Sequence, residues 1–205
     1  ATLTVPLLPL FRGDPGVAVT ARSLGGEVHA QFGLTGSPRT AATWEGLDLA
    51  RLVLPPTLAE LPLAGSAAGE FDADFDRGNP IQTEGRADLV FRGVKIGPGK
   101  AMGFPVPEVD LGNGRIRLAS QGGKLEVESA VFEEGSLGIE FTGSVLLRPD
   151  TARSLVNGLL SLRPNEQLSQ ELALVFAVFP GAKSSDGRYT ARVRGTLGAP
   201  RLLAR

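Results

Sequence analysis

The sequence predicts a mainly β protein built on one large, twisted antiparallel sheet. Apolar and polar residues alternate with a period of two over most of the chain, the pattern of strands with one buried and one wet face. Sheets with a single wet face are normally antiparallel. The 27 Gly and 15 Pro among 205 residues are too many for a helical bundle and suit short strands joined by turns. We therefore expect about ten or more strands.

The alternating segments follow one another along the chain, and each has apolar residues on one side and polar residues on the other. Phe71 and Ala73, for example, alternate with Asp72 and Asp74, so that one side of the strand is apolar and the other is charged. In the segment 124–131, Leu125, Val127 and Val131 are assigned to the apolar side. The other segments are 17–22, 27–32, 88–92, 115–118, 137–147 and 188–194. The residues expected to form the apolar face of the sheet are Phe71, Phe75, Leu89, Phe91, Ile116, Leu118, Leu125, Val127, Ile139, Phe141 and Val193.

Turn chemistry separates these segments. Glycine pairs occur at 24–26 and 121–123, a Glu-Gly dipeptide at 134–135 and an Asp-Gly dipeptide at 186–187, where the alternation stops. Asn113-Gly114 is the strongest candidate for a two-residue type I′ hairpin, because both residues tolerate positive φ.

Residues 165–179 follow a helical period instead. Leu168, Leu172, Val175, Phe176 and Phe179 form a stripe at the spacing of one helix face, with Asn165 as N-cap and Pro180-Gly181 as the stop. The segment 150–163 fits either a helix capped by Asp150 or a long strand ending at Pro164, and periodicity alone does not separate these alternatives.

The composition excludes several classes of function. The chain has no Cys and one His, which excludes disulfide scaffolds, thiol nucleophiles, thiolate zinc sites and multi-histidine metal sites. The net charge of −1 argues against a nucleic-acid binder. No apolar run reaches the roughly 18 residues that span a bilayer. We expect no catalytic activity, no metal and no cofactor.

One cluster of acidic residues has a structural interpretation that outweighs a functional one. Asp72, Asp74 and Asp76 have the spacing of a calcium loop, but Arg77 and Thr83 stand where that loop needs Gly and Glu. The solvent face of a strand explains the aspartates better.

Histidine and arginine side chains also fall on the wet faces of predicted strands. His29 shares its strand face with Glu27, so it could act in acid-base chemistry, but solvation is the simpler interpretation. Arg188, Arg192 and Arg194 line one face of a terminal strand, which is either solvated or contacts an anionic partner such as a lipid headgroup.

The predicted helix is too small to cover the apolar face of such a sheet. A helix of 15 residues is about 22 Å long. The apolar face must therefore close on itself as a sandwich or barrel, or stay partly open as a groove. An open groove of this kind would be an interaction or lipid site.

Six segments share a pattern of glycine and strand spacings: 85–97, 111–118, 122–125, 137–149, 159–164 and 186–200. The last is the most telling, with an Asp-Gly turn, a strand and a Gly-Thr-Leu-x-x-Pro close. Through these spacings the second half of the chain resembles the N protein of bacterial type II secretion systems, the GspN family, and the resemblance covers roughly residues 45–200. The same strand pattern also looks like the periplasmic β-grooves of AsmA- and TamB-type proteins.

The resemblance implies a fold, a location and two functions. Residues 1–205 would form a single periplasmic β-rich domain, attached to the inner membrane through an N-terminal anchor that this chain lacks, with a strand over 149–164. As a secretion component it would be non-catalytic and would bind other secretion-system proteins of the inner membrane or the secretin. The AsmA and TamB likeness implies the alternative, a half-open groove that binds or transfers phospholipid.

Overall fold

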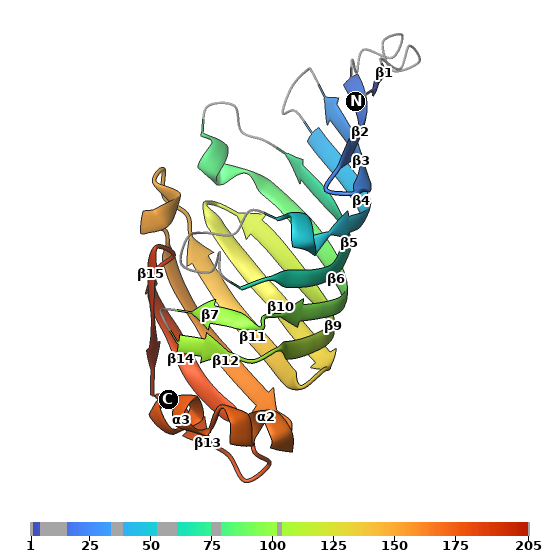
Figure 1. Cartoon of the computed structure of the whole chain (residues 1–205). Coiled ribbons are helices and arrows are strands. Elements are labelled where there is room, and N and C mark those ends of the chain that lie inside the picture. Colours follow the sequence, from blue (N-terminus) through green and yellow to red (C-terminus); the bar gives the residue numbers. More distant parts are fainter. Residues whose placement is uncertain are drawn as a thin grey trace.

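A computed structural model describes residues 2–4, 16–33, 39–52, 61–74, 79–101 and 104–204. In this part of the chain the protein is mainly β, as predicted, with one antiparallel sheet of thirteen strands and a separate two-stranded hairpin (Figure 1). The sheet is not closed into a barrel, because β1 and the pair β13 and β15 lie at its two ends. The strands are β1 (Thr2–Thr4), β2 (Gly16–Ser23), β3 (Gly26–Gly33), β4 (Arg39–Asp48), β5 (Leu63–Asp74), β6 (Glu84–Ile96), β7 (Gly99–Ala101), β8 (Phe104–Val106), β9 (Val109–Gln121), β10 (Lys124–Glu134), β11 (Leu137–Leu146), β12 (Leu155–Pro164), β13 (Ala182–Lys183), β14 (Tyr189–Thr196) and β15 (Ala199–Leu203).

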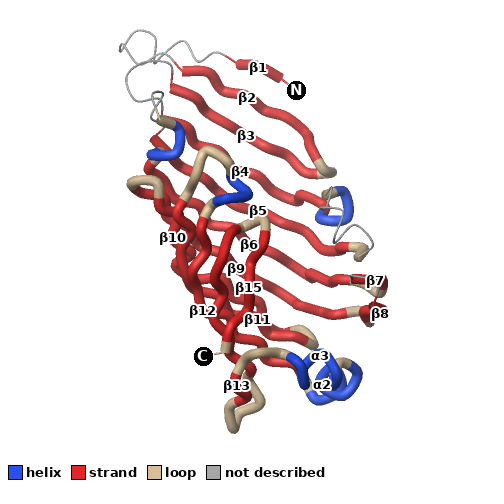
Figure 2. Tube along the Cα trace, turned by 90° about the vertical axis from the view of Figure 1, so that its left-hand side faces the viewer, coloured by secondary structure: helices blue, strands red, loops and turns tan. Residues whose placement is uncertain are grey.

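The sheet is a meander in which strands pair largely in the order of the sequence. The hairpin β7–β8 is inserted between the paired strands β6 and β9, and β14 pairs with β12 on one side and with β13 and β15 on the other. Figure 2 shows the strands stacked along the length of the molecule, with the helices at the strand ends. The helices are η1 (Leu49–Arg51), η2 (Pro80–Gln82), η3 (Thr151–Arg153), α2 (Glu166–Glu171) and α3 (Ala173–Val178).

The strand register brings apolar residues from all parts of the chain onto one side of the sheet, which we call the inner face. The opposite side is the outer face. Two rows of directly paired residues cross the inner face. The first row is Val28, Trp44, Gly69, Leu89, Ile116, Ala130, Phe141, Leu160 and Ala191. The second row is Ala30, Ala42, Phe71, Ala87, Leu118, Val127, Gly143, Gly158, Val193 and Leu202.

The compact core of the protein lies at one end of the strands, where helices reach over the inner face. Leu49 of η1 and Leu168 of α2 pack there with buried residues of β5, β6 and β9. Away from this cluster most inner-face side chains remain partly exposed. The described part of the sheet therefore has one covered end, and over the rest of its inner face the described residues form no second layer (Figure 1).

The helix predicted over 165–179 is present as two short helices. Asn165 caps the start as predicted, since its side chain accepts a hydrogen bond of 2.8 Å from the Leu168 amide. The backbone of Leu172, with φ −106° and ψ 25°, departs from helical geometry and separates α2 from α3. The prediction that Val175 lies in the buried stripe is wrong, because Val175 is 55 % exposed while Phe176 is buried.

The segment 150–163 contains both kinds of structure. Asp150 caps the single turn η3 by accepting a hydrogen bond of 3.1 Å from the Ala152 amide. β12 then pairs with β11 from Leu155 to Pro164. The strand interpretation is correct from Leu155 onward and wrong for the residues before it, where the Asp150 side chain and the turn compete with strand pairing.

Asn113-Gly114 does not form a hairpin turn and lies inside β9. A Cβ added at Gly114 would lie 2.3 Å from the Phe132 ring, so this position needs a glycine for space. The dipeptide that the sequence marks as a turn thus serves the packing of the inner face.

Candidate functional site

The inner face is the candidate site because it gathers nearly all the apolar residues expected from the sequence. Every expected residue except Phe75 lies on it, and Phe75 falls outside the described residues. These residues are half-buried and none is fully covered. No charged side chain interrupts the two rows that cross the face.

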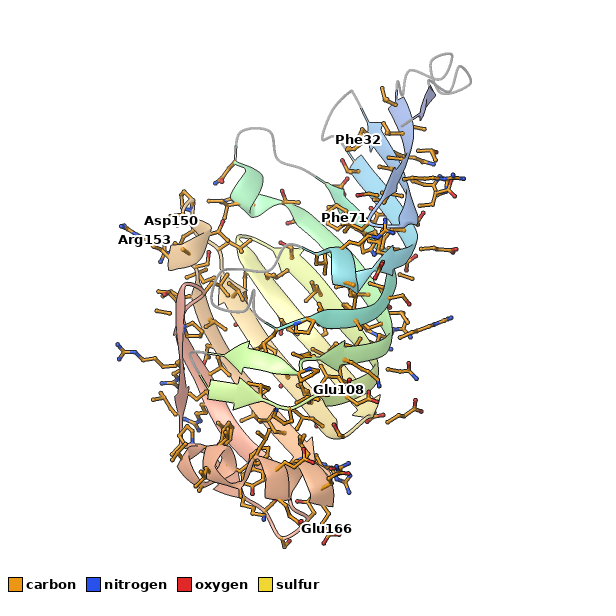
Figure 3. All side chains as sticks on the ribbon, viewed as in Figure 1. Phe32, Phe71, Glu108, Asp150, Arg153 and Glu166 are labelled. Carbon is orange, nitrogen blue, oxygen red and sulfur yellow. The ribbon has the colours of Figure 1, made fainter. Side chains whose placement is uncertain are left out.

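The sheet is curved, and the inner face lies on the concave side of the curve, which we call the trough. Figure 3 shows Phe32 and Phe71 on the inside of the curve, while many charged side chains project from its outside. The rings of Phe91 and Phe132 lie 5.4 Å apart although β9 separates their strands, which stand about 4.8 Å from each neighbour. The two rings meet above Gly114 of β9, which has no side chain to separate them.

Several aromatic side chains lie flat against glycines of neighbouring strands. A Cβ at Gly69 would lie 2.8 Å from the Trp44 ring, and a Cβ at Gly158 would lie 2.5 Å from the Phe141 ring. Phe132 covers Gly114 in the same way. Because each ring fills the space that a side chain on the glycine would take, the inner face presents carbon atoms there and has no deep hollow at these glycines.

A β-bulge changes which residues of β10 face inward. The register shifts between Val127 and Ser129, so Ala130 and Phe132 join the inner face. Val131 pairs with the outward-facing Glu140, which makes its predicted place on the apolar side wrong. The bulge inserts an extra residue and so inverts the alternation after it. Phe132 was missed for this reason.

Other inner-face residues were missed because their strands were read incompletely. Trp44 and Leu162 lie on the same face as Leu89 and Phe141. The alternation of Trp44 with Thr43 and Glu45 is the sequence signal that places it on a strand.

The outer face carries cross-strand ion pairs that fix the register of the sheet. Arg115 of β9 donates hydrogen bonds of 2.7 and 2.5 Å to both carboxylate oxygens of Asp88 on β6, and Arg117 lies 3.8 Å from the same carboxylate. Arg39 of β4 binds Asp72 of β5 in the same bidentate way. The hydrogen bond from Arg115 and its positive charge lower the pKa of Asp88 below the ordinary value of 3.8.

The Asp88–Arg115 pair predicts a pH-dependent contribution to stability. A carboxylate with a lowered folded-state pKa stabilises the fold above its unfolded pKa, and this contribution is lost as the pH falls through the folded value. Asp88→Asn should cost about 1 kcal/mol at neutral pH. The difference from wild type should shrink below about pH 4. Urea midpoints measured across this range test the prediction, with the exposed Asp74→Asn as control. A difference that grows in acid would contradict it.

The polar candidates in the described part of the chain contact neighbouring polar or charged side chains on the outer face. His29 is exposed and contacts Thr20 at 3.0 Å and Glu27 at 3.5 Å. Asp72 is paired with Arg39, and Asp76 lies outside the described residues. Among the described residues no group of His, Asp and Glu has the arrangement that could hold a metal ion.

The three arginines predicted on one face of a terminal strand have different surroundings: one is paired with carboxylates and two are exposed. Arg188 lies 3.5 Å from Glu140 and 3.6 Å from Asp186. Arg192 and Arg194 are exposed on the outer face, beside a shallow hollow of about 570 Å³.

The fold and the inner face define a class of protein: an open, single-layer antiparallel sheet whose apolar face lines a trough. Comparison with protein-family models, curated proteins and solved structures gives no significant match. None of the helices in the described ranges is long and apolar enough to cross a membrane.

Proposed function

We propose that the inner face binds the acyl chains of phospholipids and that the protein is a non-catalytic lipid-binding component on the periplasmic side of the inner membrane. The observation that carries this proposal is the apolar surface, free of charged side chains in its two rows, that continues across the sheet from β3 to β15 and that other described residues cover mainly at one end. The resemblance to secretion N proteins and to AsmA- and TamB-type grooves supports the location.

The physical chemistry of the inner face suits a long apolar chain. Removing one CH₂ group from water is worth about 0.8 kcal/mol, so a flexible hydrocarbon gains binding energy along the whole trough. The face offers carbon surface from side chains such as Leu89, Ile116 and Phe141, with no charge that would remain unpaired under an acyl chain. The charges stay on the outer face, in contact with water.

A crosslinking experiment tests the proposal directly. Photo-crosslinking amino acids placed at Phe91, Ile116 and Val127 should trap phospholipid when the protein is purified from bacterial cells. The same probe at Val90 and Arg117, on the outer face, should trap none. Mass spectrometry of the adducts identifies the lipid. Equal yields from both faces, or no lipid adduct at the inner positions, would reject the proposal.

Variants of one strand supply a matched measurement. Leu89→Gln places a polar group in the inner face of β6, whereas Val90→Gln places the same group one residue along on the outer face. We expect Leu89→Gln to weaken binding of a fluorescent fatty acid by about tenfold, since a buried amide without a partner costs roughly 1–3 kcal/mol. Val90→Gln should bind like wild type. Equal loss in both variants would indicate a general effect on folding.

A second candidate function uses the edge of the sheet. β15 is exposed along its length, and no strand in the described part of the chain pairs with its far side. Unpaired strand edges bind extended segments of other proteins through main-chain hydrogen bonds. Together with the secretion-system resemblance, this favours a secretion protein of the inner membrane or the secretin as partner. A crosslinker at Arg201 should then trap that protein, and lipid adducts alone would exclude it.

A further inference from the structure

Helix α3 is apolar on all its sides. The residues from Leu172 to Ala182 include no charged and no hydrogen-bonding side chain. One side of the helix faces the protein, where the Phe176 ring stacks on Tyr189 at 4.8 Å. The other side faces solvent, with Leu174 84 % exposed and Val178 82 % exposed. A helix that is apolar all round is normally surrounded by apolar material, and the described residues cover only one side of it.

The exposed side of α3 is joined to the inner face. Leu172, directly before α3, packs against the core cluster at the covered end of the sheet. That cluster includes Val109 and Leu111 of β9 and Leu168 of α2. Apolar residues therefore follow one another from the core cluster at the end of the inner face, through Leu172, to α3.

The chemistry of α3 suits a lipid bilayer better than a protein surface. Its exposed side consists of aliphatic side chains and lacks the Trp, Tyr and Arg residues that dominate protein–protein binding energy. Side chains as exposed as Leu174 and Val178 protrude, and the fluid boundary between headgroups and acyl chains accepts protrusions without a matching shape. α3 has six residues, too few to span a bilayer, so it can only lie at the surface.

The charges around α3 indicate how such binding would respond to salt. Glu166 and Glu171 of α2 precede it, and Lys183 follows it with its ammonium 5.3 Å from the Tyr189 ring. There is no cationic excess here that would draw α3 to anionic headgroups. Binding through α3 must therefore depend on the aliphatic side chains and resist added salt.

We infer that α3 inserts Leu174, Val175 and Val178 into the surface of a phospholipid bilayer and holds the covered end of the sheet against the membrane. This role rests on the proposed function, because it gives acyl chains a route between the bilayer and the inner face. The insertion itself is measured separately from lipid binding in the trough.

Vesicle sedimentation tests the inference. Wild-type protein should sediment with vesicles of phosphatidylethanolamine and phosphatidylglycerol, and its partition coefficient should change little when salt is raised. The double variant Leu174→Ser/Val178→Ser should lower that coefficient at least about tenfold. The control Leu146→Ser/Leu197→Ser alters leucines that are 42 % and 43 % exposed elsewhere, and should sediment like wild type.

The possible outcomes separate the two proposals. Loss of vesicle binding in the α3 variant, with lipid still trapped by a crosslinker at Ile116, supports the inference. Wild-type protein that traps lipid at Ile116 but does not sediment with vesicles overturns the inference and leaves the proposed function standing. A wild-type dimer in solution that the α3 variant dissociates would assign α3 to self-association and also overturn the inference. Vesicle binding through α3 without lipid at Ile116 would reject the proposed function alone.

Discussion

Leu168→Ala should lower the free energy of unfolding by about 3–4 kcal/mol, within the range for leucines removed from a closed core. Leu168 is 2 % exposed and joins α2 to the cluster that contains Leu49, Val94 and Leu111. Since Leu168 is enclosed between α2 and the strands β5, β6 and β9, the cavity has little means to collapse. Urea unfolding followed by Trp44 fluorescence measures the loss.

The control for this prediction comes from the neighbouring helix. Leu174→Ala removes the same atoms from a side chain that is 84 % exposed, and should change the unfolding midpoint by no more than about 0.5 kcal/mol. Equal midpoints for the Leu168 and Leu174 variants would mean that α2 does not pack on the sheet as described.

Gly112→Ala should be about as damaging, at about 3–4 kcal/mol, for a different reason. Gly112 has φ +67°, and a Cβ there would lie 2.2 Å from the Glu133 carbonyl oxygen. The left-handed backbone costs a non-glycine residue roughly 1–2 kcal/mol. The clash with backbone atoms of β10 adds overpacking of about 1–3 kcal/mol.

Gly122→Ala separates these two contributions. Gly122 has φ +57°, close to that of Gly112, but no atom lies within 4 Å of its added Cβ. This variant should lose only the backbone contribution of about 1 kcal/mol. Thermal or urea midpoints for the two variants test the assignment. If both lost the same stability, the approach of Gly112 to Glu133 would be unimportant.

The residues of a strand that lie on the inner face could be predicted, because successive side chains point to opposite faces of a sheet. The assignment of Ile139 and Phe141 to the apolar face is confirmed, since both pair with residues of β12 on the inner face. The prediction failed at Val131, where a bulge shifts the register without a sequence signal such as glycine. The alternation of apolar and polar residues thus predicts the face of each side chain between two bulges, but it does not predict where a bulge occurs.

The degree of burial was not predictable from the pattern. A residue such as Phe141 alternates in the same way whether its face meets a second sheet or water, so the sequence left a sandwich, a barrel and an open groove as alternatives. In the structure Phe141 is only half-buried. Phe141→Ala should therefore cost about 2 kcal/mol, less than the roughly 3–5 kcal/mol of a fully buried ring.

The break between α2 and α3 escaped prediction for a related reason. Leu172 belongs to the helical stripe and carries no helix-breaking residue type, yet its backbone leaves the helix. The Asn165 amide donates a hydrogen bond of 2.8 Å to the Ser136 carbonyl, and this bond holds the start of α2 against the turn before β11. Tertiary contacts of this kind override local preference.

The pairing of strands in sequence order makes the sheet a one-dimensional array. Each hairpin contacts mainly the hairpins before and after it, so stability is close to a sum of local terms and neighbouring interfaces, as in repeat proteins. The best-packed hairpins, around β6 and β9, stand in the middle of this array. We therefore expect opening to begin at the ends, so that backbone amides of β2 and β15 exchange with solvent well before those of β6 and β9.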